Sequence, residues 1–205
     1  MLRKEFELIC ILSGAILVAS LVPSGKCFPM ASGAISRGLT IYRATVDLDT
    51  YKKEPTNYEP LALRLLGIEL VYVERIPALD IPLREVKTVL IRKERIPRNS
   101  KEREEMIREE LGERPRQPVP QDLPPEHYYY HASFVLNEKG ARTITRFSRE
   151  NLNQLFVLSL RSQPFAVGTI LQPLTGDSFS VDLFEKDVDQ LRNIFLPLKD
   201  KLIWE

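Results

Sequence analysis

The segment at residues 133–160 decides the fold class, and it reads SFVLNEKGARTITRFSRENLNQLFVLSL. Its first residues, up to Leu136, alternate around apolar positions as a half-buried strand does. Asn137 is a residue type that caps helices, and apolar residues follow it at helical spacing. The run Phe156–Leu160 is short and apolar, as in a buried strand. The segment therefore predicts a strand, a helix and a second strand, and the helix is expected to bury Ala141, Ile144 and Phe147.

Downstream, the pattern predicts more strands and a final helix. Phe165–Leu171 and Ser178–Val181 read as strands, with a turn at residues 173–177 between them. A single helical stripe follows, made by Phe184, Val188, Leu191 and Phe195. The order β-α-β-β-(β)-α predicts an α+β fold, with helices packed on one face of a mostly antiparallel sheet. This C-terminal domain is expected to span residues 127–205.

Upstream, residues 39–96 are predicted to form a smaller N-terminal α+β block. The apolar alternation from Tyr42 to Leu48 predicts a strand, and the polar residues 50–60 predict a loop. We expect a helical turn at Leu61–Leu66, ended by Gly67. Two further strands are expected at Glu69–Arg75 and Val86–Glu94.

Residues 97–126 differ from both blocks because they are polar and rich in proline. Asn99 and Glu102 have the spacing of a capping box, and Gly112 follows the predicted helix as a stop. This helix has few apolar residues. We therefore expect a solvated insertion between two strands rather than a part of the core.

The N-terminal residues 1–24 have the pattern of a targeting segment. Two basic residues precede the almost uncharged run Leu8–Val22, which is typical of an export signal and short for a membrane span. A cleaved signal and a retained membrane anchor fit equally well, and lipidation at Cys27 fits less well because Lys26 precedes it. The alternative is a buried helix of a cytosolic domain. We expect export, with residues 25–38 as a linker and the rest of the chain outside the cytoplasm, in the periplasm or cell envelope.

Composition excludes several classes of function. The 29 basic and 28 acidic residues give a net charge of +1, which does not favour a nucleic-acid partner. Two cysteines cannot form a disulfide scaffold or a structural zinc site. His127 and His131 would lie on one side of a strand but about 13 Å apart, too far to share a metal ion. No motif of nucleophilic, metal-dependent or nucleotide-binding enzymes is present. We expect a protein that is not an enzyme and uses no metal or cofactor.

The segment at residues 133–160 also resembles the head of the large periplasmic domain of SecD, the protein-export accessory subunit. The resemblance rests on the strand at Phe134, the turn and helix start at Gly140 and Ala141, and the helix end at Ser148 and Asn151. It continues through Ile170, Pro173, Leu174, Thr175 and Gly176, and into the last helix at Val188 and Leu191. Upstream, DIPLREVKTVLI at residues 80–91 is similar to the segment that enters this head. The resemblance covers a third to a half of the chain. It marks structural positions and no catalytic site.

Some features depart from the SecD pattern. The family's Asp-Gly hairpin falls on Arg161 and Ser162, and the family's proline after it falls on Gly168. Residues 97–126 look inserted. SecD continues into a transmembrane bundle that uses proton flow, and that part of the function is not carried over. The resemblance implies an isolated extracytoplasmic head module.

In the SecD family the head is thought to grip an emerging unfolded polypeptide. For this chain we expect an apolar surface that accepts an extended polypeptide. The candidate residues cluster around the predicted hairpin and turn and are Phe165, Leu171, Leu174 and Phe179. Expected partners are a polypeptide or an envelope protein, together with Sec translocon components, and the membrane itself if the N-terminal segment is retained. The alternative is a scaffold subunit of an envelope complex with one fixed protein partner.

Overall fold

The computed structural model describes residues 38–65, 68–97, 99–110, 112–113, 115, 119–120, 124, 127–183, 185 and 187–205. In these residues the predicted α+β class is confirmed, and the strands divide between two sheets. The predictions for residues 1–37, including the export signal, the anchor and both cysteines, lie outside the described residues. Gly38, the last residue of the expected linker, is the first residue of a strand.

The first sheet, sheet A, has six strands in the order β2-β3-β1-β7-β8, with β4 paired to β1. Every pairing in it is antiparallel. One edge of β1 pairs with β7, and the other edge pairs with β4 and then with β3. Its strands are β1 (Gly38–Thr45), β2 (Tyr58–Leu65), β3 (Ile68–Glu74), β4 (Leu79–Pro82), β7 (Leu155–Leu160) and β8 (Gln163–Thr169).

The second sheet, sheet B, has the order β10-β5-β6-β9, and only β10 runs parallel to its neighbour among these described strands. Both sheets take strands from the two predicted blocks, 39–96 and 127–205, so the blocks share one core. The strands of sheet B are β5 (Val86–Arg95), β6 (Tyr128–Leu136), β9 (Ser178–Leu183) and β10 (Leu202–Trp204).

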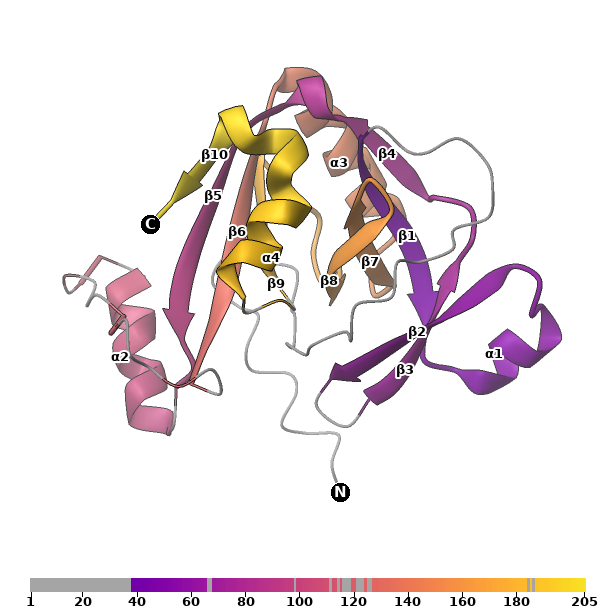
Figure 1. Ribbon diagram of the computed structural model, residues 1–205, viewed down its shortest axis with the longest axis horizontal. Coiled ribbons are helices and arrows are strands. Elements are labelled where there is room, and N and C mark those ends of the chain that lie inside the picture. The colour runs from indigo at the N-terminus through magenta and orange to yellow at the C-terminus, as the bar shows by residue number, and fades with distance from the viewer. Residues whose placement is uncertain are drawn as a thin grey trace.

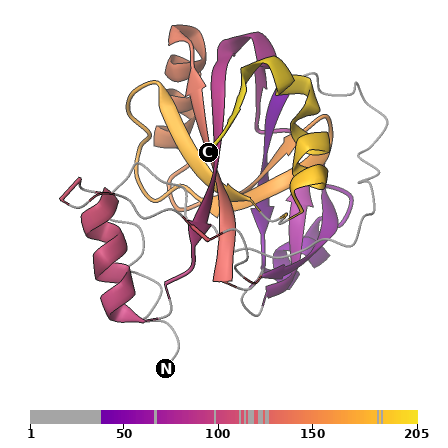
Figure 2. The ribbon, with the colours of Figure 1, turned by 60° about the vertical axis from the view of Figure 1, so that its left-hand side comes forward.

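The main core lies between the two sheets (Figure 1). The ring of Phe134, on β6, lies 5.9 Å from that of Phe165, on β8 of the other sheet. The helix α4 (Val188–Phe195) closes the near side in Figure 1, and its Phe195 ring contacts both of these phenylalanines. The helix α3 (Glu138–Glu150) lies on the far side, and the two helices separate clearly when the molecule is turned (Figure 2).

Local sequence explains the position of α3. The Asn137 side chain accepts a hydrogen bond from the Gly140 backbone N–H, which confirms the predicted N-cap. Gly140 lies close to a neighbouring segment, because a Cβ there would come within 3.3 Å of the Glu85 Cβ. At the other end the Asn151 amide donates to the Phe147 carbonyl and its Oδ1 accepts from Arg43 of β1. The C-terminal end of α3 is thus tied to sheet A, and its first turn packs against Glu85, which directly precedes β5.

Several local predictions were wrong. Leu61–Leu66 was expected to be a helical turn, but residues up to Leu65 form β2, because they pair along β3. The strand expected at Tyr42–Leu48 begins at Gly38 and ends at Thr45, and Val46 and Leu48 are exposed. The expected loop at residues 50–60 contains most of α1 (Leu48–Lys53), which Asp47 caps. Ala141 packs against the core but is only partly buried.

The charged helix α2 (Ser100–Glu110) stands apart from both sheets at the lower left of Figure 1. It begins as predicted, with the Glu102 backbone N–H donating to the Asn99 side chain. It leaves the sheet after β5 and the chain returns at β6, where the Ile96 N–H donates to the His127 carbonyl. Short 3₁₀ turns, η1 (Leu83–Glu85) and η3 (Leu196–Lys201), complete the described elements.

Candidate functional site: a groove along α3

Three of the four residues predicted to form a polypeptide-binding surface are in the core. Phe165, Leu174 and Phe179 are 0%, 3% and 2% exposed, whereas Leu171 is 44% exposed. Phe165 and Phe179 point inward because they occupy the core-facing positions of β8 and β9, and the Phe179 ring stacks on Phe134 at 5.0 Å. The four side chains therefore do not make a shared surface in this fold.

The loop that carries Leu171 and Leu174 nevertheless lies against α3. The Ser148 hydroxyl, on α3, accepts a hydrogen bond of 2.9 Å from the Leu174 backbone N–H and donates one to the Thr145 carbonyl. Ser148 is fully buried, so water does not replace these bonds. The bonds fix the β8–β9 loop beside the helix.

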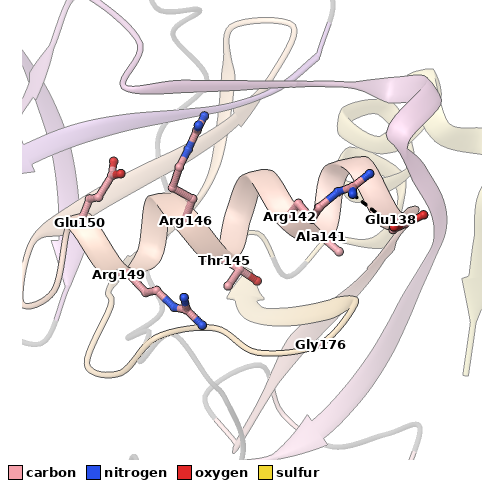
Figure 3. A pocket seen from close by; sticks show the side chains of 8 residues that line it. All are labelled: Glu138, Ala141, Arg142, Thr145, Arg146, Arg149, Glu150 and Gly176. Atoms are coloured by element: carbon pink, nitrogen blue, oxygen red, sulfur yellow. Dashed lines mark ion pairs between the residues drawn. The ribbon is translucent and has the colours of Figure 1, made fainter.

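A groove of about 460 Å³ runs along the exposed face of α3, with this loop at its side (Figure 3). Gly176 contributes the loop side, and its positive φ of 95° is a conformation that favours glycine. All other lining residues come from successive turns of α3. The complete lining is Glu138, Ala141, Arg142, Thr145, Arg146, Arg149, Glu150 and Gly176.

Three arginines make the groove predominantly basic. Arg142, Arg146 and Arg149 are spaced by four and three residues, so they lie on neighbouring turns of one helix face. Arg142 pairs with Glu138 at 3.3 Å, near the start of the helix. Arg146 and Arg149 are exposed and form no ion pair with any residue that the structure describes. Two guanidinium groups are thus available to carboxylates from another molecule.

The sequence did not predict this groove, although some residues that it singled out lie in or beside it. Ala141 and Gly176, marked by the SecD resemblance as structural positions, both line the groove. Gly140 and Asn151 hold α3 in place, and Pro173 is exposed in the loop. The arginines were missed, although three arginines spaced by four and three on a predicted helix are a signal that the sequence contains.

A second polar cluster lies on the outer face of sheet B. His131 Nδ1 lies 2.7 Å from Asp182 Oδ1, and the Ser133 and Ser180 hydroxyls lie 2.9 Å apart in the adjacent cross-strand pair. Burial raises the pKa of Asp182, and the hydrogen bond and charge interaction with His131 partly oppose this. Among the described residues, no group of three or more His, Cys, Asp or Glu side chains is placed to hold a metal ion.

None of the helices in the described part of the chain is long and apolar enough to span a membrane.

Among known proteins, similarity to this chain is found only with solved structures. No protein-family model matches the chain, and no curated protein matches it. The chain is similar to SecDF in its super-membrane-facing form, with a TM-score of 0.31 and 17% identity over 82% of this chain. It spans 30% of that SecDF chain. A second structure, of a membrane component SecDF that enhances protein export, gives a TM-score of 0.31 and 18% identity, covering 78% of this chain and 92% of that one.

Proposed function

We propose that the chain is a non-enzymatic, extracytoplasmic module that binds polypeptide and assists protein export or the assembly of envelope proteins. The observation that carries the proposal is the arginine-lined groove between α3 and the β8–β9 loop. The groove is open along the helix, so a passing chain can enter it from the side (Figure 3).

The lining favours an extended segment with acidic side chains. The fork of donors on Arg146 or Arg149 matches a carboxylate in a bidentate pair. The aliphatic stems of the arginines and the methyl group of Ala141 offer apolar contact that does not depend on sequence. A few such contacts along one helix face suit weak binding of many different segments.

The link to export comes from the sequence resemblance to the SecD head. That resemblance runs from Phe134 to Phe195 and so includes both α3 and the β8–β9 loop. The neighbouring SecDF is described as a membrane component that enhances protein export. By this proposal the partners are exported polypeptides and components of the Sec translocon.

Crosslinking in living cells tests the proposal. A photoreactive residue is placed at Thr145, which lines the groove, and captured proteins are identified by mass spectrometry. We expect many different exported chains, and we expect capture to fall when Arg146 and Arg149 are both changed to Glu. The matched control is Arg192→Glu, an exposed arginine on α4. We expect this variant to fold, as checked by circular dichroism, and to keep capture.

Other results would overturn the proposal. Capture that is equal in the double variant and in the control would exclude the groove as the binding surface. Capture of one envelope protein in a fixed ratio would replace it with the alternative function, a scaffold subunit with a single partner.

A further inference from the structure

Sheet A has a second apolar face, opposite the main core. The alternation of each strand places Tyr42 of β1, Val157 of β7 and Val167 of β8 side by side on this face. Val73 and Leu61 extend it across β3 and β2. We call this set the outer cluster, and its buried members are Tyr42, Leu61, Val71, Val73, Val157 and Val167.

The outer cluster is buried, yet the described helices do not contribute to it. Each of its six members is 6% exposed or less. The partly buried residues packed against it, Ala44 and Leu155, also belong to sheet A. A single layer of strands cannot bury its own outer face, so this face requires a covering segment. Among described residues, neither a helix nor sheet B supplies an apolar side chain to it.

Polar atoms at the edge of the cluster indicate what kind of segment covers it. Ser159 is fully buried beside Tyr42, and its hydroxyl has no hydrogen-bond partner of good geometry in the described chain. Burial raises the pKa of Tyr42, an effect that its contact with Ser159 partly offsets. A covering backbone could donate to or accept from Ser159, whereas a lipid tail could not.

The sequence directly before β1 has the right length and composition. Residues 27–36 read CFPMASGAIS and carry no charge, and they lie between Lys26 and Arg37. Ten extended residues reach about 33 Å. The five strands of the cluster span about 19 Å at the usual spacing of neighbouring strands. Small residues in this stretch allow a close approach to the sheet, and Phe28, Met30 and Ile35 supply apolar area.

The start of β1 fixes the point at which this stretch joins sheet A. At Gly38 a Cβ would lie 2.3 Å from Asp80 Oδ1 and 2.5 Å from the Ile81 carbonyl, so the backbone enters the sheet pressed against β4. Residue 36 is two positions upstream of that point. A tether this short gives the stretch a high effective concentration at the face.

We propose that residues 27–36 pack across the outer cluster of sheet A as part of the folded domain. The stretch expected as a linker is then the cover of the second apolar face. The proposal goes beyond the proposed function and holds whether residues 1–24 are cleaved or retained, because both forms keep residues 27–36.

Disulfide trapping on the full chain tests this. Cys10→Ser leaves Cys27 as the native thiol, and Val157→Cys adds a partner thiol at the centre of the cluster. Ile203→Cys, on the exposed side of sheet B, is the matched control. Under mild oxidation we expect the Cys27 crosslink to Val157→Cys to form roughly tenfold faster or more than to the control. Peptide mass spectrometry identifies the bond and confirms a free Cys27 thiol beforehand.

A second measurement requires no substitution in the outer cluster. In the Cys10→Ser chain, we expect Cys27 to react with a maleimide roughly tenfold more slowly than in a synthetic peptide of residues 23–37. Equal alkylation rates, or equal crosslinking to both partner thiols, would overturn the proposal. Trapping of Cys10 instead, in a Cys27→Ser chain, would also overturn it and assign the face to the apolar run Leu8–Val22.

Discussion

At the scale of single residues, the β7–β8 hairpin holds two side chains in an unfavourable backbone conformation. Arg161 and Ser162 have φ values of 48° and 66°, the left-handed region that favours glycine and asparagine. The turn has two residues between the paired Leu160 and Gln163, a loop in which Asn-Gly is strongly preferred. The SecD pattern described above has Asp-Gly at these two positions.

Replacing this turn by Asn-Gly should therefore stabilise the protein. For Arg161→Asn combined with Ser162→Gly we expect a gain of about 1 kcal/mol in the free energy of unfolding, because the left-handed conformation costs about 1–2 kcal/mol for ordinary residues. Urea denaturation of the two proteins measures it. Asn153 also has a positive φ, so we expect Asn153→Ala to lower the free energy of unfolding. A loss of stability in the Asn-Gly variant would contradict the assigned turn.

A second residue-scale prediction concerns pH and the His131–Asp182 pair. Burial raises the pKa of Asp182 above its ordinary value of 3.8, so the folded state binds its proton more readily than the unfolded state does. The contribution of a raised pKa is fully present below about pH 3.8 and is lost as the pH rises through the folded-state value. Relative to Asp182→Asn, the natural chain should gain stability as the pH falls from 7 toward 4.

Denaturation curves at pH 7 and pH 4.5 for the two proteins provide the measurement. Since 21% of the Asp182 side chain remains exposed, we expect a small difference. If the free energy of unfolding changes equally with pH in both proteins, burial does not determine the pKa of Asp182. The same conclusion follows if the natural chain is more stable relative to Asp182→Asn at pH 7 than at pH 4.5.

At the scale of elements, the groove depends on how the β8–β9 loop is fastened to α3. Ser148→Ala removes the acceptor of the buried Leu174 N–H. We expect a loss of about 1–3 kcal/mol in the free energy of unfolding, the usual cost of an unpaired buried polar group. Capture at Thr145 should fall with it, because the loop forms one side of the groove. Ser178→Ala, at an exposed strand position, is the control and should change neither quantity.

The elements also show what sequence patterns can determine. The helices capped by Asn99 and Asn137 were predicted correctly because capping and periodicity act within a few residues. The strand at Leu61 was missed because its apolar run suits a helix equally well, and pairing with β3 decides the outcome. The spacing of apolar residues within one segment does not identify the strand with which that segment will pair.

The same limit explains the error at the candidate site. Phe165 and Phe179 were expected on a surface because they flank a predicted turn, but the turn does not determine which sheet faces which. Once two sheets pack face to face, both rings fall between them. Arg146 and Arg149 could have been placed on the exposed side of α3, because Ile144 and Phe147 define its buried side.

At the scale of the whole molecule, the two sheets form one core from chain segments on either side of the insertion at residues 97–126. The insertion leaves and rejoins sheet B at one point, where Ile96 and His127 are hydrogen-bonded. Contacts between the insertion and β5 include an ion pair of 3.7 Å between Arg95 and Glu109 and a hydrogen bond from Lys93 to the Pro120 carbonyl. The Lys93 bond is exposed and the Arg95 side chain is 34% exposed, whereas the Glu109 side chain is only 9% exposed, so we expect these contacts together to contribute on the order of 1 kcal/mol.

Replacement of residues 97–126 by Asn-Gly should therefore keep the fold. The new two-residue loop would close a hairpin at the existing Ile96–His127 pair. Shortening a loop of about 30 residues to two lowers the entropic cost of closure by on the order of 2 kcal/mol, which offsets the lost contacts. We expect an unchanged or higher Tm and full capture at Thr145. A shortened chain that is soluble and folded but captures nothing would place part of the client-binding surface on α2. One that does not fold would show that α2 is needed for the closure of sheet B.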